Sequence, residues 1–477
     1  MQVYKYEIFT TDIEKQINSG VLQSGHRLPS IREIKKRYQL STSSVQSGYE
    51  YLMIRGLVES IPGSGHFVAV IHREDIPDVK TALLPVVKDA AFTNKVMLTS
   101  ARIKPSESSS FNAAAPGDLL VPQKLILRTM QEVIREKGAS LLRYYPLNGL
   151  PSLKIEIAKH MGLHGCYLNP DELIITDGAL QALTVALAAV TIPGDIIALE
   201  SPCVFSVLEA IASLGLQVIE IPVHYRNGFD IEYFEKACIQ NDIRAVVVTP
   251  NFHNPIGIIM SDEAKKELLK IALDYQIPII ENDIYGDLYV REKRPSCIKS
   301  FDSTGMVMTF SSFSKTLAPG IRLGWLHAGK FYSQAEKTRF GLGRTVSPIY
   351  QELMLKLLQG TAYKRHLRSF RKKLSQQAFQ VLNFVRKAFP EGSYFHRPEG
   401  GYSIWGQLPE QTDMKAFYEY CEKNRILFTP GNTFSLSDQY SHHFRIVFAD
   451  RMTSESFVLL ENAGHKAKEL TDYTINL

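Results

Sequence analysis

Residues 308–325 read MTFSSFSKTLAPGIRLGW, and the fold of most of the chain can be inferred outward from them. The apolar run that ends at Phe310 predicts a buried strand. Lys315 follows this strand, with Ser312 three residues before it and Arg322 seven after it. An ammonium group at the end of a buried strand must be paired or lose its proton, and a neutral lysine can form a Schiff base with an aldehyde. Serine and arginine suit a phosphate, so the stretch predicts a cofactor site, the alternative being a surface loop with a solvated lysine.

The pattern Ser-Phe-Ser-Lys-x-x-x-Pro-Gly-x-Arg-x-Gly-Trp resembles the cofactor-lysine segment of fold-type I aminotransferases, which use pyridoxal 5'-phosphate. The resemblance implies that Lys315 is the catalytic lysine and carries the cofactor as an aldimine. It also implies that Ser312, Ser314 and Arg322 help to bind the cofactor.

Composition indicates a soluble globular protein with more than one domain. A chain of 477 residues exceeds the usual size of one domain, so two or three folded units are expected. The net charge of +5 permits nucleic-acid binding without requiring it. The five cysteines are scattered and include no C-x-x-C pair, which argues against a disulfide framework or a zinc site and favours a reducing cytosol. No signal peptide or long apolar run is evident, so we expect a cytoplasmic protein with no membrane span and no metal site.

Residues 1–70 predict a small helical unit that ends in a hairpin. Three helices are expected. The first covers residues 8–19 and carries Ile8, Ile13 and Ile17 among polar residues, and the second begins at the capping box Ser30–Glu33 and ends at about Tyr38. The third begins in the turn after Leu40 and ends at about Arg55, with Val45, Tyr49 and Leu52 buried. Glycines around two short apolar runs then predict a strand, a tight turn and a strand.

Helices followed by a hairpin make a winged helix, whose third helix enters the major groove of DNA. Short polar side chains near the start of that helix suit contacts with bases and phosphates: Ser43, Ser44, Gln46 and Ser47. Gln46 can pair with adenine through two hydrogen bonds. Arg32 and the basic run 35–37 can neutralise phosphates, although the run is also compatible with a solvated helix face.

The order Gly-x-Arg-Leu-Pro-Ser-x-Arg-Glu, a polar turn, Gly-Leu-Val and Gly-Ser-Gly-x-Phe-Val resembles the GntR-type winged helix-turn-helix. The resemblance implies a domain over residues 1–70 that binds a double-stranded DNA operator, with Gly65 and His66 on the wing. Two positions depart from the family: residues 42–44 are Thr-Ser-Ser where an arginine is usual, and His66 stands where threonine is common. These departures concern the operator sequence rather than the class of domain.

Residues 71–110 lack a sustained period and contain prolines, mixed charges and a serine run, which predicts a linker with at most short elements near 83–87 and 90–98. Beyond it, apolar strands alternate with helical segments from about 170 to 325. This alternation predicts an α/β domain over residues 111–477 with a largely parallel sheet and helices on both faces. A smaller α/β unit is expected over about 370–477.

Further segments resemble the phosphate-binding parts of the aminotransferase site. Gly178, Ala179 and Leu180 lie between a predicted strand and helix, where free N–H groups and the helix dipole suit a phosphate. The spacing from Tyr144 to Gly149 matches the segment whose tyrosine reaches the cofactor phosphate of the neighbouring subunit, which implies a homodimer. Taken alone, this tyrosine is also compatible with ordinary packing.

Other segments resemble the parts of the site that hold the cofactor ring. Asn254, in an Asn-Pro-x-Gly sequence, would bond to the cofactor 3'-oxygen together with Tyr285. Asp283 would keep the pyridine nitrogen protonated and so make the ring an electron sink. The position that usually carries a stacking aromatic residue is Val204, and Phe205 beside it is the candidate substitute.

Arg445 matches the arginine that binds a substrate α-carboxylate in this fold, a role suited to a bidentate guanidinium. A strand arginine paired with a core carboxylate is the alternative.

The order winged helix, linker and aminotransferase-like domain is similar to the MocR-type subfamily of GntR regulators. The resemblance implies a cytoplasmic transcription regulator whose effector is a small amine, an amino acid or the vitamer itself, meaning the cofactor pyridoxal 5'-phosphate. Two alternatives stay open. One is an active aminotransferase with an accessory DNA-binding domain, and the other is direct sensing of the vitamer with no amine substrate.

Overall fold

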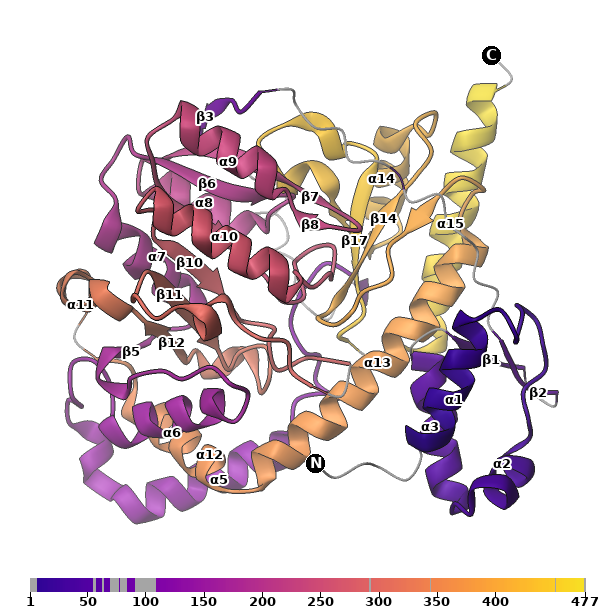
Figure 1. Ribbon diagram of the computed structural model, residues 1–477, viewed down its shortest axis with the longest axis horizontal. Coiled ribbons are helices and arrows are strands. Elements are labelled where there is room, and N and C mark those ends of the chain that lie inside the picture. The colour runs from indigo at the N-terminus through magenta and orange to yellow at the C-terminus, as the bar shows by residue number, and fades with distance from the viewer. Residues whose placement is uncertain are drawn as a thin grey trace. The chain divides into compact units, whose positions relative to one another are not determined.

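The computed structural model describes residues 7–54, 57–61, 64–68, 77, 84–90, 109–290, 293–343, 345–450 and 452–475 (Figure 1). The chain divides into two compact units, Met1–Pro77 and Asp78–Leu477. Each unit has its own hydrophobic core.

The N-terminal unit is a winged helix with the predicted order of elements: α1 (Glu7–Asn18), α2 (Ile31–Tyr38), α3 (Thr42–Ile54), β1 (Val58–Ile61) and β2 (Gly65–Val68). Both hydrogen bonds of the capping box between Ser30 and Glu33 are present at the start of α2. The strands pair antiparallel, with Val58 opposite Val68. Val45, Tyr49 and Leu52 are buried as predicted.

One detail of the first helix was wrong in the sequence interpretation. Ile8 is 61% exposed, whereas Phe9 is fully buried with Ile13 and Ile17. Residues 9, 13 and 17 follow one another at a spacing of four, so they form the stripe that packs on the core, and residue 8 falls outside it.

The larger unit is built on a mixed sheet with the strand order β3-β7-β6-β9-β10-β11-β12-β5, and β8 pairs with β7. The strands are β3 (Val87–Asp89), β5 (Leu173–Thr176), β6 (Ile196–Ser201), β7 (Gln217–His224), β8 (Gly228–Phe229), β9 (Ile243–Val248), β10 (Ile279–Asn282), β11 (Val307–Ser312) and β12 (Gly324–His327). The central pairs β7–β6, β6–β9, β9–β10 and β10–β11 are parallel, which confirms the predicted sheet type.

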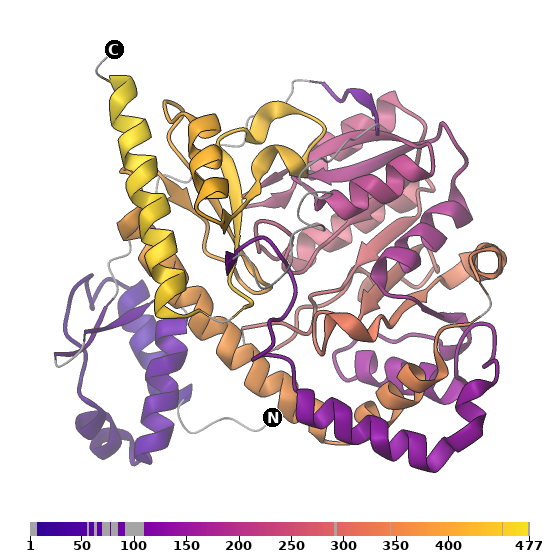
Figure 2. The ribbon, with the colours of Figure 1, turned by 180° about the vertical axis from the view of Figure 1, so that it is seen from behind.

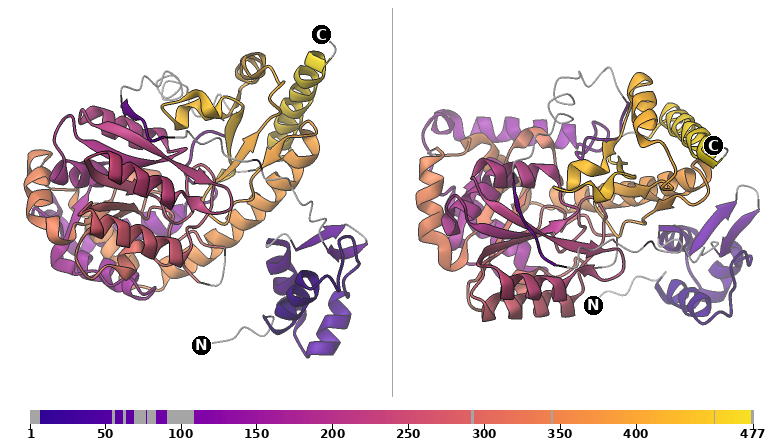
Figure 3. Two further views of the ribbon diagram at one scale, coloured as in Figure 1. Left: turned by 45° about the horizontal axis from the view of Figure 1, so that its top comes forward. Right: turned by 90° about the horizontal axis from the view of Figure 1, so that it is seen from above.

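Helices cover both faces of this sheet (Figures 1 and 3). On one face α7 (Ala179–Val190), α8 (Phe205–Ser213) and α11 (Tyr332–Gly341) pack on Ile280 and Met308. On the other face α9 (Ile231–Gln240) and α10 (Asp262–Asp274) pack on Ile279 and Val307. A third cluster joins α5 (Gln123–Lys137), α6 (Pro151–Gly162) and α12 (Pro348–Gln359).

The C-terminal part forms a smaller sheet with the order β13-β14-β17-β16. Its elements are α13 (Ala362–Ala388), β13 (Tyr394–Phe395), β14 (Ser403–Gln407), α14 (Met414–Lys423), β15 (Ile426–Leu427), β16 (Thr429–Pro430), β17 (His443–Val447) and α15 (Ser454–Ile475). The helices α13 and α15 pack together in the core of this part, and Figure 2 shows α15 in yellow beside the small sheet.

The predicted linker, residues 71–110, lies largely outside the described residues. Two described pieces of it belong to the larger unit. The strand β3 pairs antiparallel with β7, and β4 (Ser109–Ser110) pairs with β15. The segment is therefore not wholly a spacer, because backbone pairing at a sheet edge can recruit a short strand that has little periodicity of its own.

Candidate cofactor and ligand site

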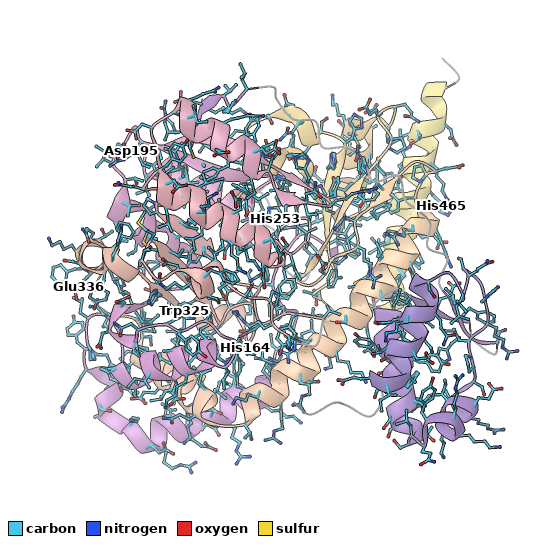
Figure 4. All side chains as sticks on the ribbon, in the orientation of Figure 1. His164, Asp195, His253, Trp325, Glu336 and His465 are labelled. Atoms are coloured by element: carbon cyan, nitrogen blue, oxygen red, sulfur yellow. The ribbon has the colours of Figure 1, made fainter. Side chains whose placement is uncertain are left out.

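A cavity of about 520 Å³ lies where β10 and β11 end and where α7 and α8 begin. Ten of the predicted site residues line it: Ala179, Leu180, Phe205, Asn254, Tyr285, Ser312, Ser314, Lys315, Arg322 and Arg445. They come from segments that are far apart in the sequence, and ligand sites at the carboxyl ends of parallel strands are typical of α/β folds. Trp325 and His253, both labelled in Figure 4, are buried, so the segments around Lys315 and Asn254 both reach the interior.

Lys315 directs its ammonium nitrogen into the cavity wall, where Nζ donates a hydrogen bond to the carbonyl oxygen of Ala114. The Tyr402 hydroxyl donates to the Lys315 carbonyl, which holds the backbone in place. Burial, together with the positive charges of Arg445 and Arg322, lowers the pKa of Lys315 to about 8. A substantial neutral fraction therefore exists near physiological pH, which is the form that reacts with a carbonyl carbon.

A cradle for an anion surrounds the start of α7. Gly178 caps this helix with a φ of 82°, a conformation that glycine adopts readily. Arg322 donates from Nη2 to the Asp177 carbonyl oxygen at 3.1 Å, and a Cβ on Gly178 would lie 3.1 Å from the same Nη2. The Ser312 and Ser314 hydroxyl oxygens lie 2.9 Å apart on the other side of the strand end. Free helix N–H groups, hydroxyls and a guanidinium thus converge, and this donor set fits a phosphate.

Asn254 connects two other side chains of the cavity. Its Nδ2 donates to the Tyr285 hydroxyl at 3.4 Å, and its Oδ1 accepts from Nη1 of Arg445 at 3.0 Å. Burial raises the pKa of Tyr285 to about 12, so its hydroxyl remains a donor at neutral pH. The arrangement can hold a phenolic oxygen of a ligand ring.

Arg445 is fully buried and, among the described residues, is hydrogen-bonded to neutral oxygens: the Asn112 carbonyl at 2.7 Å, Thr429 Oγ1 at 3.2 Å and Asn254. Its Nε has no hydrogen-bond partner in the part of the chain that the structure describes. Burial lowers the pKa of Arg445 to about 10, so the guanidinium stays charged. A buried cation without a carboxylate partner beside a cavity favours binding of an anionic ligand group over the alternative of an internal ion pair.

Asp283 does not line the cavity, in contrast to its expected role beside the ring nitrogen. Its carboxylate instead accepts a hydrogen bond from Nη2 of Arg294, and Arg294 Nε donates to Asp287 at 2.9 Å. The reason is geometric: β10 ends at Asn282, and the side chains of the residues on either side of Asp283, Asn282 and Ile284, face the cavity.

Of two further expected residues, Tyr144 lies outside the cavity and Phe205 lines it. Tyr144 is 77% exposed and does not line the cavity of its own chain, so its reach into a neighbouring subunit stays a prediction. Val204 and Phe205 both line the cavity, and the Phe205 ring lies 6.0 Å from the Phe434 ring and 5.9 Å from the Arg445 guanidinium carbon.

The residues predicted to contact DNA differ in their exposure. Arg32, Ser43, Gln46 and Ser47 are exposed, and Ser44 is partly buried with its hydroxyl 2.8 Å from that of Ser41. Gly65 has a φ of 111° at the start of the second wing strand. His66 stacks on the buried Tyr49 ring at 4.0 Å and 6°, and burial lowers its pKa. Its structural contact with the domain core had no local sequence signal.

Several cavity residues were missed by the sequence interpretation: Asn112, Ala114, Asn282, Thr429 and Thr433. Four of them belong to two segments, 112–114 and 429–433, that carry no recognisable motif, and Asn282 directly precedes Asp283, the residue predicted in its place. His160, His164 and Asp287 bring potential ligand atoms within 4.8 Å of one another. Arg294 already balances the Asp287 charge, which disfavours a cation there, and the absence of a metal site stays a prediction.

The fold and this site define a fold-type I aminotransferase-like domain on the same chain as a winged helix. The chain belongs to the aminotransferase class I and II family, which matches residues 115–461, and residues 6–68 match the gntR family of bacterial regulatory proteins. These findings confirm the predicted fold class and the resemblance to GntR regulators that carry an aminotransferase-like domain.

Individual relatives agree with both assignments. The chain is 32% identical over 93% of its length to the uncharacterized HTH-type transcriptional regulator YjiR of Escherichia coli, and covers 94% of that protein. It is 26% identical over 94% of its length to the HTH-type transcriptional regulator NorG of Staphylococcus aureus, and covers 99% of it. A Pyrococcus horikoshii kynurenine aminotransferase, solved in complex with PMP, superposes with a TM-score of 0.74 at 26% identity, over 79% of this chain and 95% of that one.

The family match and the cofactor complex of that enzyme imply pyridoxal 5'-phosphate as the cofactor of this domain. The residues present fit it: Lys315 for the aldehyde, the α7 cradle for the phosphate and Tyr285 with Asn254 for the ring oxygen. In the described part of the chain, no helix has both the length and the apolar character that crossing a membrane requires.

Proposed function

We propose that this protein is a cytoplasmic transcription regulator that binds a DNA operator and senses an amino compound or the vitamer through pyridoxal phosphate held by Lys315. The regulator class rests on the winged helix and on the HTH-type relatives. The observation that carries the sensing role is the cavity itself. It combines a lysine of lowered pKa, an anion cradle and a buried arginine without a carboxylate partner among the described residues.

The chain's own residues suit an amino acid as the sensed compound. Bound pyridoxal phosphate supplies an electrophilic carbon for a primary amine. Arg445 can bind a carboxylate of the incoming ligand through two parallel hydrogen bonds. Lys315, whose pKa burial lowers to about 8, would supply the amine that holds the cofactor aldehyde. A ligand of this kind can shift a conformational equilibrium only by its differential affinity for the two states.

A homodimer forms part of the proposal. Tyr144 and Leu142, two residues apart in the sequence, are 77% and 89% exposed. Exposed large apolar side chains that lie together favour contact with another chain. An active aminotransferase with an accessory DNA-binding domain is the second candidate, since Lys315, Tyr285 and Arg445 meet in one cavity.

Glu220 on β7 connects the segment beside the cavity, residues 431–437, to β3. This connection could transmit a ligand-induced shift. Oε1 of Glu220 accepts hydrogen bonds from the Ser435 hydroxyl at 2.5 Å and from the Leu436 N–H at 3.1 Å, two and three residues after the cavity residue Thr433. Its Oε2 pairs with Lys88 on β3. β3 is the first described strand after the winged helix in the sequence, so a shift of the 431–437 segment would act on its attachment.

Replacing Lys88 by glutamine should therefore weaken the coupling between ligand and DNA. We expect the ligand-induced change in operator affinity to fall by about fivefold or more, within the usual range of coupling energies. Ligand binding, followed by the cofactor absorbance, should stay unchanged because Lys88 lies outside the cavity. Lys236→Gln, an exposed lysine on α9, is the matched control, and equal coupling in both variants would contradict this role of the connection.

The proposed function itself is tested with the full-length protein loaded with pyridoxal phosphate. A duplex selected from a random library serves as operator, and its affinity is measured by fluorescence anisotropy with and without a panel of amino acids and amines. We expect at least one compound to change both the cofactor spectrum and the operator affinity. Spectral changes with constant DNA affinity across the panel would instead favour the aminotransferase.

Arg32→Ala should weaken binding to the same duplex and lower the slope of its salt dependence by about 1, as expected for one lost phosphate contact. The cofactor spectrum should not change. Lys236→Ala removes the same charge from the exposed side of α9 in the larger unit and should leave DNA affinity as in the wild type. Unaltered DNA affinity in Arg32→Ala would count against this placement of α2.

A further inference from the structure

The end of β10 places an amide, rather than a carboxylate, on the cavity side of the sheet. Side chains alternate along the strand: Ile280 packs with α7 and α8, and Ile279 packs with α9 and α10. Asn282 shares the face of Ile280 and lines the cavity. On the neighbouring strand β11 the same face carries Phe310 and Ser312, which also line the cavity. Asn282 is therefore part of the floor on which a cofactor ring would lie.

The Asp283 carboxylate is committed elsewhere. Its side chain is fully buried, and its Oδ2 forms an ion pair with Arg294, whose side chain is 2% exposed. Its Oδ1 has no hydrogen-bond partner among the described residues, but Asp283 does not line the cavity. Arg294 also pairs with Asp287 through Oδ1, and Oδ2 of Asp287 lies 2.8 Å from Nε2 of His160, so both oxygens of Asp287 have partners. These residues line a separate void of about 20 Å³ behind Ser312. Such a cluster has a structural role, because a buried carboxylate that loses its partner is costly.

The hydrogen-bonding of Asn282 leaves a donor for a ligand. Its Oδ1 accepts from the Ile284 N–H at 3.2 Å, and one N–H of Nδ2 points to the Thr249 hydroxyl at 3.4 Å. An amide nitrogen has two N–H groups, so the second can donate to a ring nitrogen that carries a lone pair. An ionised carboxylate only accepts hydrogen bonds and would require that nitrogen to be protonated.

We propose that Asn282, and not Asp283, contacts the ring nitrogen of the bound cofactor and holds it in the unprotonated form. This inference rests on the proposed function, which it deepens. A ring with a neutral nitrogen is a weaker electron sink. The domain then binds an amine at the cofactor carbon but transfers the amino group slowly, which suits a sensor better than a production enzyme.

The test uses full-length protein loaded with pyridoxal phosphate that is labelled with ¹⁵N in the ring. The ¹⁵N chemical shift at neutral pH should report an unprotonated nitrogen in the wild type. In Asn282→Asp the pKa of the ring nitrogen should rise by roughly 1–3 units, the usual effect of an adjacent opposite charge, and the signal should move to the protonated position. The same variant should transfer the amino group of a bound amino acid about tenfold faster or more.

Asp283→Asn is the discriminating control, because it should leave the wild-type ¹⁵N shift in place while lowering the melting temperature. If that variant fails to fold, Asp287→Asn perturbs the same ion cluster and serves instead. A protonated ring nitrogen in the wild type, or a shift that depends on Asp283 and not on Asn282, would overturn the assignment. The measurement contains no DNA, so failure of the regulatory proposal would appear separately, as an operator affinity that no ligand alters.

Discussion

Replacing Lys315 by alanine should abolish the visible absorbance of the bound cofactor and lower its affinity by about two orders of magnitude, or roughly 2.8 kcal/mol. The covalent link requires the Lys315 amine, which lies within the cavity. The remaining donors around α7 would still bind the phosphate, so weak noncovalent binding should persist. Absorbance titration and dialysis measure both effects. Lys330→Ala, an exposed lysine outside the cavity, should behave as the wild type, and a band that survives in Lys315→Ala would refute the cofactor assignment.

The pH dependence of cofactor uptake tests the lowered pKa of Lys315 independently. Its pKa is lowered from 10.5 to about 8, chiefly by burial. Only the neutral amine attacks an aldehyde, so the rate at which the cofactor-free protein takes up pyridoxal phosphate should rise with pH and level off above about 8. For a lysine with its ordinary pKa, the rise would continue towards 10.5. Stopped-flow absorbance across this range distinguishes the two.

Gly324→Ala should disrupt the phosphate cradle more than any other single methyl addition near Lys315. A Cβ at position 324 would lie 2.6 Å from the carbonyl carbon of Gly178 and 2.9 Å from its Cα. Backbone atoms cannot move aside as a flexible side chain can, so β12 and the start of α7 must separate. We expect a loss of about 1–3 kcal/mol in the free energy of unfolding, as for overpacked cores. Cofactor affinity should fall by about 100-fold, since the helix N–H groups move with Gly178.

The matched control is Gly320→Ala in the same loop. A Cβ at residue 320 meets no atom within 4 Å, and its φ lies outside the left-handed region. Thermal unfolding and cofactor titration of the two variants separate local crowding from a general intolerance of the loop to alanine. Equal cofactor affinity in both would show that the cradle does not depend on the contact between residues 178 and 324.

Local patterns were sufficient for much of the fold. The capping box at Ser30 was sufficient to predict where α2 begins, because both of its hydrogen bonds lie within one turn of the chain. The apolar runs around residues 245 and 308 predicted buried parallel strands, since strands covered on both faces are apolar at every position. Lys315, Ser312 and Arg322 could be interpreted together because they lie in one contiguous stretch, from the end of β11 to the turn before β12.

Features that depend on where a strand ends could not be predicted in this way. Asp283 and Tyr285 are two residues apart, so the alternation of side chains along a continuous strand would place both on one face. Because β10 stops at Asn282 and a turn follows, Tyr285 reaches the cavity and Asp283 does not. The position of His66 against Tyr49 and the recruitment of β3 from the predicted linker likewise depend on partners distant in sequence.

The sequence by itself therefore determined the two domains, the class of cofactor and ten of the residues that line the cavity, because these are encoded in contiguous motifs. Only the tertiary structure decided which of two adjacent polar residues, Asn282 or Asp283, lines the cavity. It also showed Arg445 without a carboxylate partner among the described residues, and Glu220 between the cavity and β3. The physical reason is that side-chain direction and charge pairing depend on the packing of separate segments, and no local pattern records that packing.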